Sequence, residues 1–215
     1  EIKIKQGQPR AVIPRTSSST SNMAMITYNM AGSDQIQDIA RQLVSQTNKD
    51  QDIKIFVFQE IFELKIEHAG DALFASKKAE AINDALLIEL KYQQGCQHEI
   101  LASTHMMGLH MVIFQKPSAG AFAKELRSVS TNKPRTKGAV ALELEYKHNT
   151  ILVIGLHLSS KDGPEADAKR EEEFGRKVSW RIYSSCEPDH EATDTGVFPA
   201  VPRFLHNRRI LCRCI

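Results

Sequence analysis

Residues 138–158 constrain the fold more than any other part of the chain, because they describe two adjacent strands with different surroundings. In GAVALELEYK (138–147), apolar and charged side chains alternate, which is typical of a strand with one buried face. TILVIGLHL (150–158) is apolar on both faces, which predicts a central strand that is covered on both sides. Between them, His148-Asn149 predicts a tight turn. The stretch is therefore predicted to be a β-hairpin in a sheet that is packed on two faces.

The N-terminal third predicts a strand, a helix and a second strand. MAMITYNM (23–30) is a short β-prone run that stops at AGSD, and Ser33 or Asp34 is suited to cap the helix that follows. The helix has an amphipathic stripe made of Ile36, Ile39, Ala40, Leu43 and Val44. IKIFVFQE (53–60) then predicts a buried strand that ends on the carboxylate of Glu60. Such a carboxylate either lies at the mouth of a site or is a solvated strand end.

Further helices and paired strands follow along the chain. The predicted elements are a helix over about 68–92, strands over 98–106 and 108–116, and a charged helix beginning near Pro164. Antiparallel strand pairs with helices between and beyond them predict an α/β sandwich. Residues 1–21 are expected to be a flexible lead-in. Residues 22–215 are expected to form a single domain, with no clear pattern over 178–215.

Composition excludes several classes of protein. The formal net charge is only +2, so the whole chain carries no strong field that favours nucleic acid or an anionic membrane. The pair Cys212-x-Cys214 lacks the spacing of a zinc site, and four cysteines in a chain of this length favour a reducing compartment. No apolar run approaches the roughly 18–20 residues of a membrane helix. We therefore expect a cytoplasmic protein without a transmembrane segment or a nucleic-acid partner.

Short motifs at the ends of the predicted strands resemble those of the inositol polyphosphate 5-phosphatases, which belong to the endonuclease/exonuclease/phosphatase superfamily. In chain order, they are TYNM, FVFQE, GLHMVIF, TKGAVAL and IGLHLSS. The resemblance covers about residues 22–177. It implies a DNase I-like α/β sandwich of two mainly antiparallel sheets flanked by helices, with part of its second half missing or rearranged.

The resemblance also implies roles for particular residues. Glu60 would bind Mg²⁺, Asn29 and His157 would be catalytic and contact the phosphate, and Lys137 and Arg170 would bind the substrate. One glutamate on a rigid strand suits Mg²⁺, which keeps several waters and commonly takes one or two protein carboxylates. Each residue has a structural alternative: a turn for Asn29, a core position for His157 and a solvated surface for the two cations. A structural role is also expected for His68, His98, His105 and His110.

The second half of the chain departs from the family pattern. The Gly-Asp-x-Asn motif, whose aspartate orients or deprotonates the attacking water in that family, does not occur in this sequence. Pro188-Asp189-His190 resembles the family's late Ser-Asp-His motif in composition, but it comes too early in the chain. Arg209-Ile210-Leu211 resembles part of a family stretch that contributes to substrate recognition.

These observations define one leading function and leave others open. The resemblance implies a Mg²⁺-dependent phosphatase that removes the 5-phosphate from inositol polyphosphates or phosphoinositides through in-line attack by water. A nuclease or another phosphodiesterase of the same superfamily is a first alternative. A catalytically inactive relative that binds phosphoinositide, membrane or protein is a second, and peripheral membrane association also stays open.

Overall fold

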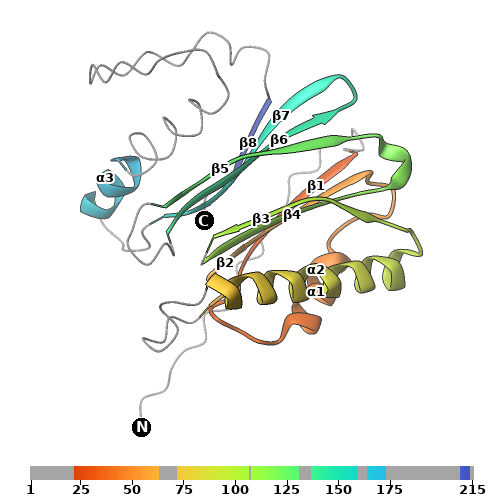
Figure 1. The fold of residues 1–215 in the computed structure, drawn as a ribbon, viewed down its shortest axis with the longest axis horizontal. Coiled ribbons are helices and arrows are strands. Elements are labelled where there is room, and N and C mark those ends of the chain that lie inside the picture. Colours follow the sequence, from red (N-terminus) through yellow and green to blue (C-terminus); the bar gives the residue numbers. More distant parts are fainter. Residues whose placement is uncertain are drawn as a thin grey trace.

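The computed structural model describes residues 22–62, 72–106, 108–130, 137–158, 164–172 and 209–213. They form two four-stranded sheets, which we name sheet A and sheet B, packed face to face (Figure 1). The strands of sheet A are, in spatial order, β1 (Met23–Asn29), β2 (Ile53–Gln59), β4 (Leu109–Gln115) and β3 (Glu99–Met106). Those of sheet B are β5 (Phe122–Ser130), β6 (Gly138–Tyr146), β7 (Asn149–His157) and β8 (Arg209–Arg213).

The helices flank this sandwich. Helices α1 (Ile36–Ser45) and α2 (Ala72–Gln94) cover the outer face of sheet A, a short 3₁₀ turn η2 (Pro117–Ala119) precedes β5, and α3 (Pro164–Glu172) follows β7 (Figure 1). Strand pairing is parallel between β1 and β2 and between β7 and β8, and antiparallel elsewhere. The predicted α/β sandwich of two mainly antiparallel sheets is therefore confirmed. Within the described ranges, no helix is both long and apolar enough to cross a membrane.

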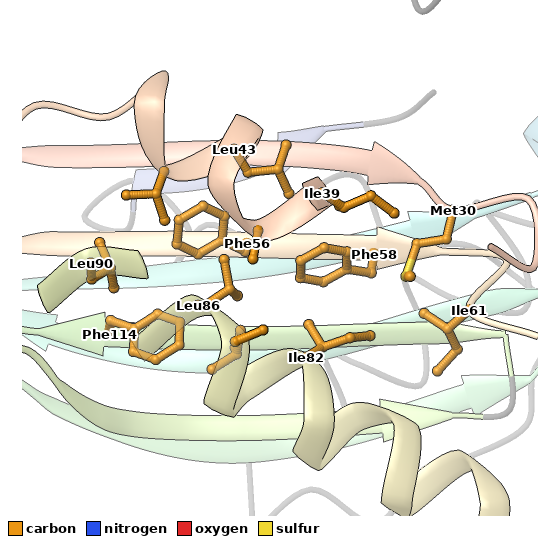
Figure 2. Close-up of a cluster of buried hydrophobic side chains, with 14 residues drawn as sticks. Met30, Ile39, Leu43, Phe56, Phe58, Ile61, Ile82, Leu86, Leu90 and Phe114 are labelled. Atoms are coloured by element: carbon orange, nitrogen blue, oxygen red, sulfur yellow. The ribbon is translucent and has the colours of Figure 1, made fainter. Parts of the chain in front are cut away.

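A first core lies between sheet A and the two helices (Figure 2). The predicted stripe of α1 contributes four buried residues, Ile39, Ala40, Leu43 and Val44. They pack with side chains from α2 and from two strands of sheet A, among them Ile82, Leu86, Leu90, Phe56, Phe58 and Phe114. Because the side chains of β2 alternate between faces, Phe56 and Phe58 join this core while the residues between and beside them face the other sheet.

A second core lies between the two sheets. The remaining side chains of β2 and their neighbours on β4 meet the apolar faces of β6 and β7, through Ile55, Val57, Met111, Ile113, Val140, Leu142 and Val153. Gly155 lets the sheets approach closely, because a Cβ atom there would lie 2.8 Å from Val57 Cγ1. On the opposite face of β7, Leu152, Ile154 and Leu156 are also buried. The prediction that this strand is covered on both faces is confirmed.

The predicted cap of the first helix is wrong. The helix begins at Ile36, with Gln35 at the N-cap and no side-chain capping hydrogen bond. Ser33 Oγ accepts a hydrogen bond from the Gln35 backbone one residue before the helix starts. The carboxylate of Asp34 is engaged elsewhere, 2.7 Å from Lys78 Nζ on α2. The Asp34 side chain, which local sequence suits for capping, therefore forms an ion pair with α2 instead.

The hairpin turn is displaced by one residue from its predicted place. Its central residues are Lys147 and His148, both with positive φ, and Tyr146 pairs with Asn149 across the turn. This is the conformation that two-residue hairpin turns favour, because its twist matches that of the strands. Asn149 is instead the first residue of β7, and its amide closes the turn by donating to the Lys147 carbonyl.

Two strands were not predicted from local patterns. β5 lies within the polar stretch 117–136, and β8 lies beyond residue 178, where no periodicity is evident. Among the described residues, β8 pairs with β7, which is far away in sequence, so nothing local marks it as a strand. The expected lead-in 1–21 and the motif Pro188-Asp189-His190 lie outside the described residues.

Polar links join the two sheets at opposite ends of the sandwich. At the carboxyl end of β2, Gln59 Nε2 donates to the Leu156 carbonyl at 2.9 Å. Before the start of β2, Asp52 Oδ2 accepts a 2.5 Å hydrogen bond from the Tyr146 hydroxyl and lies 3.2 Å from Lys147 Nζ. Since these links bracket the inter-sheet core, they oppose sliding of one sheet over the other.

Acid is expected to weaken the link at Asp52. The Tyr146 hydrogen bond, assisted by the Lys147 charge and opposed by burial, holds the pKa of Asp52 below its usual value. Because the unfolded pKa is about 3.9, this contribution to the free energy of unfolding is complete above about pH 4 to 5. It is lost as the pH falls from there through the lower folded pKa. Urea unfolding at pH 7 and pH 3 should therefore show a smaller loss on acidification for Asp52→Asn than for wild type.

A second variant checks this prediction from the other side of the hydrogen bond. Tyr146→Phe removes the donor that lowers the pKa of Asp52, so it should also lose less stability on acidification than wild type. Equal losses in Asp52→Asn and wild type would contradict a stabilising role for the ionised Asp52 carboxylate.

Candidate active site

The candidate site begins where β1 and β2 end side by side. The two strands are parallel, and Asn29 pairs with Gln59 in the last rung of their ladder. The pairing continues past the strands, because the Met30 N–H donates to the Gln59 carbonyl and the Gly32 N–H donates to the Glu60 carbonyl, both at 2.8 Å. Asn29 and Glu60 therefore emerge at the same edge of sheet A.

Glu60 adopts a backbone conformation that is unusual for a residue with a side chain. Its φ is +48°, in the left-handed region, which costs about 1–3 kcal/mol for a non-glycine residue. The next residue, Ile61, is fully buried in the helix-side core and fixes the chain after the turn. The Glu60 side chain stays 38% exposed. The turn thus presents a carboxylate to solvent from a rigid support.

Two nitrogen atoms lie close to this carboxylate, one at the end of β7 and one directly before β6. His157 Nε2 lies 3.3 Å from Glu60 Oε1, and Lys137 Nζ lies 3.6 Å from the same oxygen. The two nitrogens lie 2.5 Å apart. We refer to Glu60, Lys137 and His157 as the Glu60 cluster. It places a carboxylate, an amine and an imidazole at one point, although they come from three separate parts of the chain.

Strand register explains how Lys137 reaches this cluster. Gly138 pairs with His157 in the β6–β7 ladder, so the preceding Lys137 lies beside the end of β7. Gly138 has a φ of +150°, and a Cβ atom there would lie 2.0 Å from the Val129 carbonyl oxygen of β5. Only glycine fits at this position without moving the backbone of β5 or β6. Its place in the Lys-Gly stretch is a sequence signal for such a close approach.

Gln59, the last residue of β2, links the two sheets next to this cluster, although its place in the FVFQE motif does not indicate such a contact. Its side chain is buried, and its hydrogen bond to the Leu156 carbonyl ties the residue before Glu60 to the residue before His157. The two sheets are therefore joined directly beneath the Glu60 cluster. A buried glutamine that ends an apolar strand is the only signal that local sequence offers for this role.

Replacing Gln59 with leucine should destabilise the protein by about 1–3 kcal/mol, because the buried Leu156 carbonyl would lose its donor. Urea unfolding monitored by circular dichroism measures this change. Gln46→Leu, at an exposed helix end, is the matched control and should change the free energy of unfolding by less than about 0.5 kcal/mol. Equal effects of the two substitutions would contradict a stabilising role for the hydrogen bond between Gln59 and the Leu156 carbonyl.

The other predicted site residues lie outside these contacts. Asn29 is exposed, and its Oδ1 accepts a 2.9 Å hydrogen bond from the Ala31 N–H, as in the turn that was its structural alternative. Arg170 lies in the last turn of α3 and is partly buried. Their roles in catalysis and substrate binding stay predictions.

Two of the histidines expected to be structural are buried, His110 on β4 and His98 directly before β3. Burial lowers the pKa of His110 to about 3, and its ring lies 2.8 Å from Asn83 Oδ1. His98 lies 2.9 Å from Lys54 Nζ, and its pKa is also lowered, first by burial and then by that lysine. Both therefore stay neutral at physiological pH. His68 lies outside the described residues.

The Glu60 cluster contains one carboxylate that could serve as a ligand for a metal ion. Among the described residues there is no group of three or more His, Cys, Asp or Glu side chains that could hold a metal ion. Zinc sites use three or four such ligands, whereas Mg²⁺ commonly binds one or two carboxylates and completes its shell with water and phosphate oxygens. A single exposed carboxylate such as Glu60 is sufficient for the second kind of site.

Comparison with known proteins identifies the family. A family model described as endonuclease/exonuclease/phosphatase family 2 matches residues 26–194. Because the match spans more than half of the chain, the chain belongs to this family and has the fold of its phosphoesterases. No curated protein matches the sequence.

A solved structure shows the same fold. The inositol polyphosphate 5-phosphatase domain of SPsynaptojanin, in complex with inositol (1,4)-bisphosphate and calcium, aligns with a TM-score of 0.60 and 21% identity. The alignment covers 73% of this chain and 45% of that one. A nitrophorin from Cimex, as a ferrous NO complex, aligns with a TM-score of 0.45 and 9% identity, over 66% and 48% of the two chains. The chain thus spans less than half of either structure.

Proposed function

We propose that this chain is a Mg²⁺-dependent phosphoesterase that removes the 5-phosphate from inositol polyphosphates or phosphoinositides. The observation that supports this most is the Glu60 cluster, in which the two sheets bring a lysine nitrogen and a histidine nitrogen within 3.6 Å of one carboxylate oxygen. Membership of the phosphoesterase family and the fold shared with a 5-phosphatase domain support the same reading.

The proposed roles follow from the chemistry of each side chain. Glu60 would hold Mg²⁺, which when bound polarises the phosphoryl oxygen and offsets charge on the leaving oxygen. Lys137 would serve as a point charge for phosphate oxygens. Protonated His157 would donate its Nε2–H to the phosphate as negative charge develops there. Asn29 would donate its amide to a phosphate oxygen, and Arg170 would bind a second part of the substrate.

The attacking water has no assigned base in this proposal. In-line attack needs a water held in position, and general-base assistance typically contributes about 10²–10⁴-fold to the rate. The sequence contains no Gly-Asp-x-Asn motif to supply that group. We therefore propose an enzyme with the metal and phosphate contacts in place and with slow turnover.

A substrate panel tests this proposal. The full chain would be incubated with Mg²⁺ and inositol 1,4,5-trisphosphate or vesicles containing phosphatidylinositol 4,5-bisphosphate, with ³¹P NMR identifying which phosphate is released. DNA and sphingomyelin would test phosphodiester cleavage. Release of the 5-phosphate alone supports the proposal. Cleavage of a diester, or binding of inositol trisphosphate without any release, would overturn it in favour of a phosphodiesterase or an inactive binding protein.

A further inference from the structure

Lys78 of α2 connects the helix to both loops that leave the candidate site. Its Nζ donates to Asp34 Oδ1 at 2.7 Å and to the Gly32 carbonyl at 3.2 Å, in the loop between β1 and α1. The same ammonium lies 5.8 Å from the centre of the Phe62 ring, in the segment that follows Glu60. Its side chain is only 13% exposed. One largely buried cation thus contacts the chain after β1 and the chain after β2.

The backbone of Gly32 links Lys78 to Glu60 through two hydrogen bonds. Its carbonyl accepts from Lys78, while its N–H donates to the Glu60 carbonyl at 2.8 Å. Ala31, Gly32 and Glu60 all have positive φ, between +47° and +74°. Left-handed backbone at residues with side chains persists only where surrounding contacts determine it. Lys78 supplies such contacts from outside the loop.

We propose that Lys78 is a positioning residue that holds Glu60 in the conformation that directs its carboxylate toward Lys137 and His157. The inference rests on the proposed function, because it takes Glu60 to be the metal ligand. Lys78 itself touches neither metal nor phosphate in this account. It acts on the backbone that carries the ligand, through Gly32 on one side and Phe62 on the other.

The expected effect is on metal affinity. Loss of a group that orients a metal ligand typically weakens binding by about 10–100-fold, while removal of the ligand itself abolishes it. Lys78→Ala is therefore expected to raise the dissociation constant for the metal by about 10-fold or more. Lys78→Arg keeps the charge and the donors and should restore most of the affinity.

The experiment titrates the full chain with Mn²⁺ and follows free Mn²⁺ by electron paramagnetic resonance, since Mn²⁺ accepts the same oxygen ligands as Mg²⁺. Lys77→Ala is the matched control, because Lys77 is the adjacent, exposed lysine of the same helix. Asp34→Asn is a second variant that keeps Lys78 but weakens its closest contact, at a residue whose side chain is 94% exposed and tolerant of change. Circular dichroism establishes that each variant is folded.

The outcomes separate this inference from the function on which it rests. Weakened binding in Lys78→Ala and Asp34→Asn, with normal binding in Lys77→Ala, supports the positioning role. If Glu60→Ala abolishes Mn²⁺ binding while Lys78→Ala and Asp34→Asn bind like wild type, the positioning role is wrong. If Glu60→Ala binds Mn²⁺ like wild type, the proposed metal site itself is wrong.

Discussion

Glu60→Gln is expected to lower kcat/KM for phosphate release by about 10²–10³-fold, the usual effect of removing one group that stabilises charge in the transition state. Glutamine preserves the size of the side chain but removes the negative charge that would hold Mg²⁺. This is also the negative charge that lies 3.6 Å from Lys137 Nζ and 3.3 Å from His157 Nε2. The measurement is initial-rate phosphate release from inositol 1,4,5-trisphosphate across a range of Mg²⁺ concentrations.

Stability should change only modestly in this variant, because the Glu60 side chain is 38% exposed. Losing the charge beside Lys137 and His157 is expected to alter the free energy of unfolding by about 0–1 kcal/mol. Glu145→Gln, an exposed carboxylate on β6, is the matched control and should keep wild-type kinetics. A Glu60→Gln variant that turns over as fast as the Glu145→Gln control would remove Glu60 from the mechanism.

Gly138→Ala should destabilise the protein by about 3 kcal/mol or more, from strained backbone together with overpacking. A Cβ atom at residue 138 would lie 2.0 Å from the Val129 carbonyl oxygen and 3.0 Å from Met106 Cε. Because the Val129 oxygen is a backbone atom, this overlap can be relieved only if β5 and β6 move apart. That movement would also displace Lys137 from His157, so activity should fall in any fraction that stays folded.

Substitutions at two other glycines distinguish the cost of left-handed backbone from the cost of steric overlap. Gly95 and Gly120 also have positive φ, +62° and +59°, but a Cβ atom at either would meet nothing within 4 Å. Alanine at these positions should cost only about 1–2 kcal/mol, the usual price of left-handed backbone. Urea unfolding of all three variants measures the difference. Equal destabilisation by the three substitutions would contradict the close approach at Gly138.

Local sequence patterns predict much of this fold, because its main elements bury regular faces. The stripe of α1 and the alternation of β6 each identify a face that the structure buries, and the two apolar faces of β7 identify a central strand. β5 and β8 cannot be predicted from such local patterns. β5 is a mixed polar strand, and β8 is defined by pairing with a strand far away in sequence.

The candidate site was also predictable only in part. Strand-end motifs pointed to Glu60, Lys137 and His157, and the structure places these three side chains together. The supports beneath them were not visible in sequence. The Gln59 hydrogen bond depends on how two sheets stack, and the Lys78 contact depends on where a helix lies over a loop. Both are properties of tertiary packing, which periodicity along one segment does not encode.

The Mg²⁺ dependence of phosphate release tests the central claim most directly. The folded full chain would be assayed with inositol 1,4,5-trisphosphate in Mg²⁺, then in EDTA, and again after Mg²⁺ is returned in excess. The account predicts release that stops in EDTA and resumes with Mg²⁺. Release that continues unchanged in EDTA, or no release at all from chain shown to be folded, would contradict a metal-dependent phosphatase built on the Glu60 cluster.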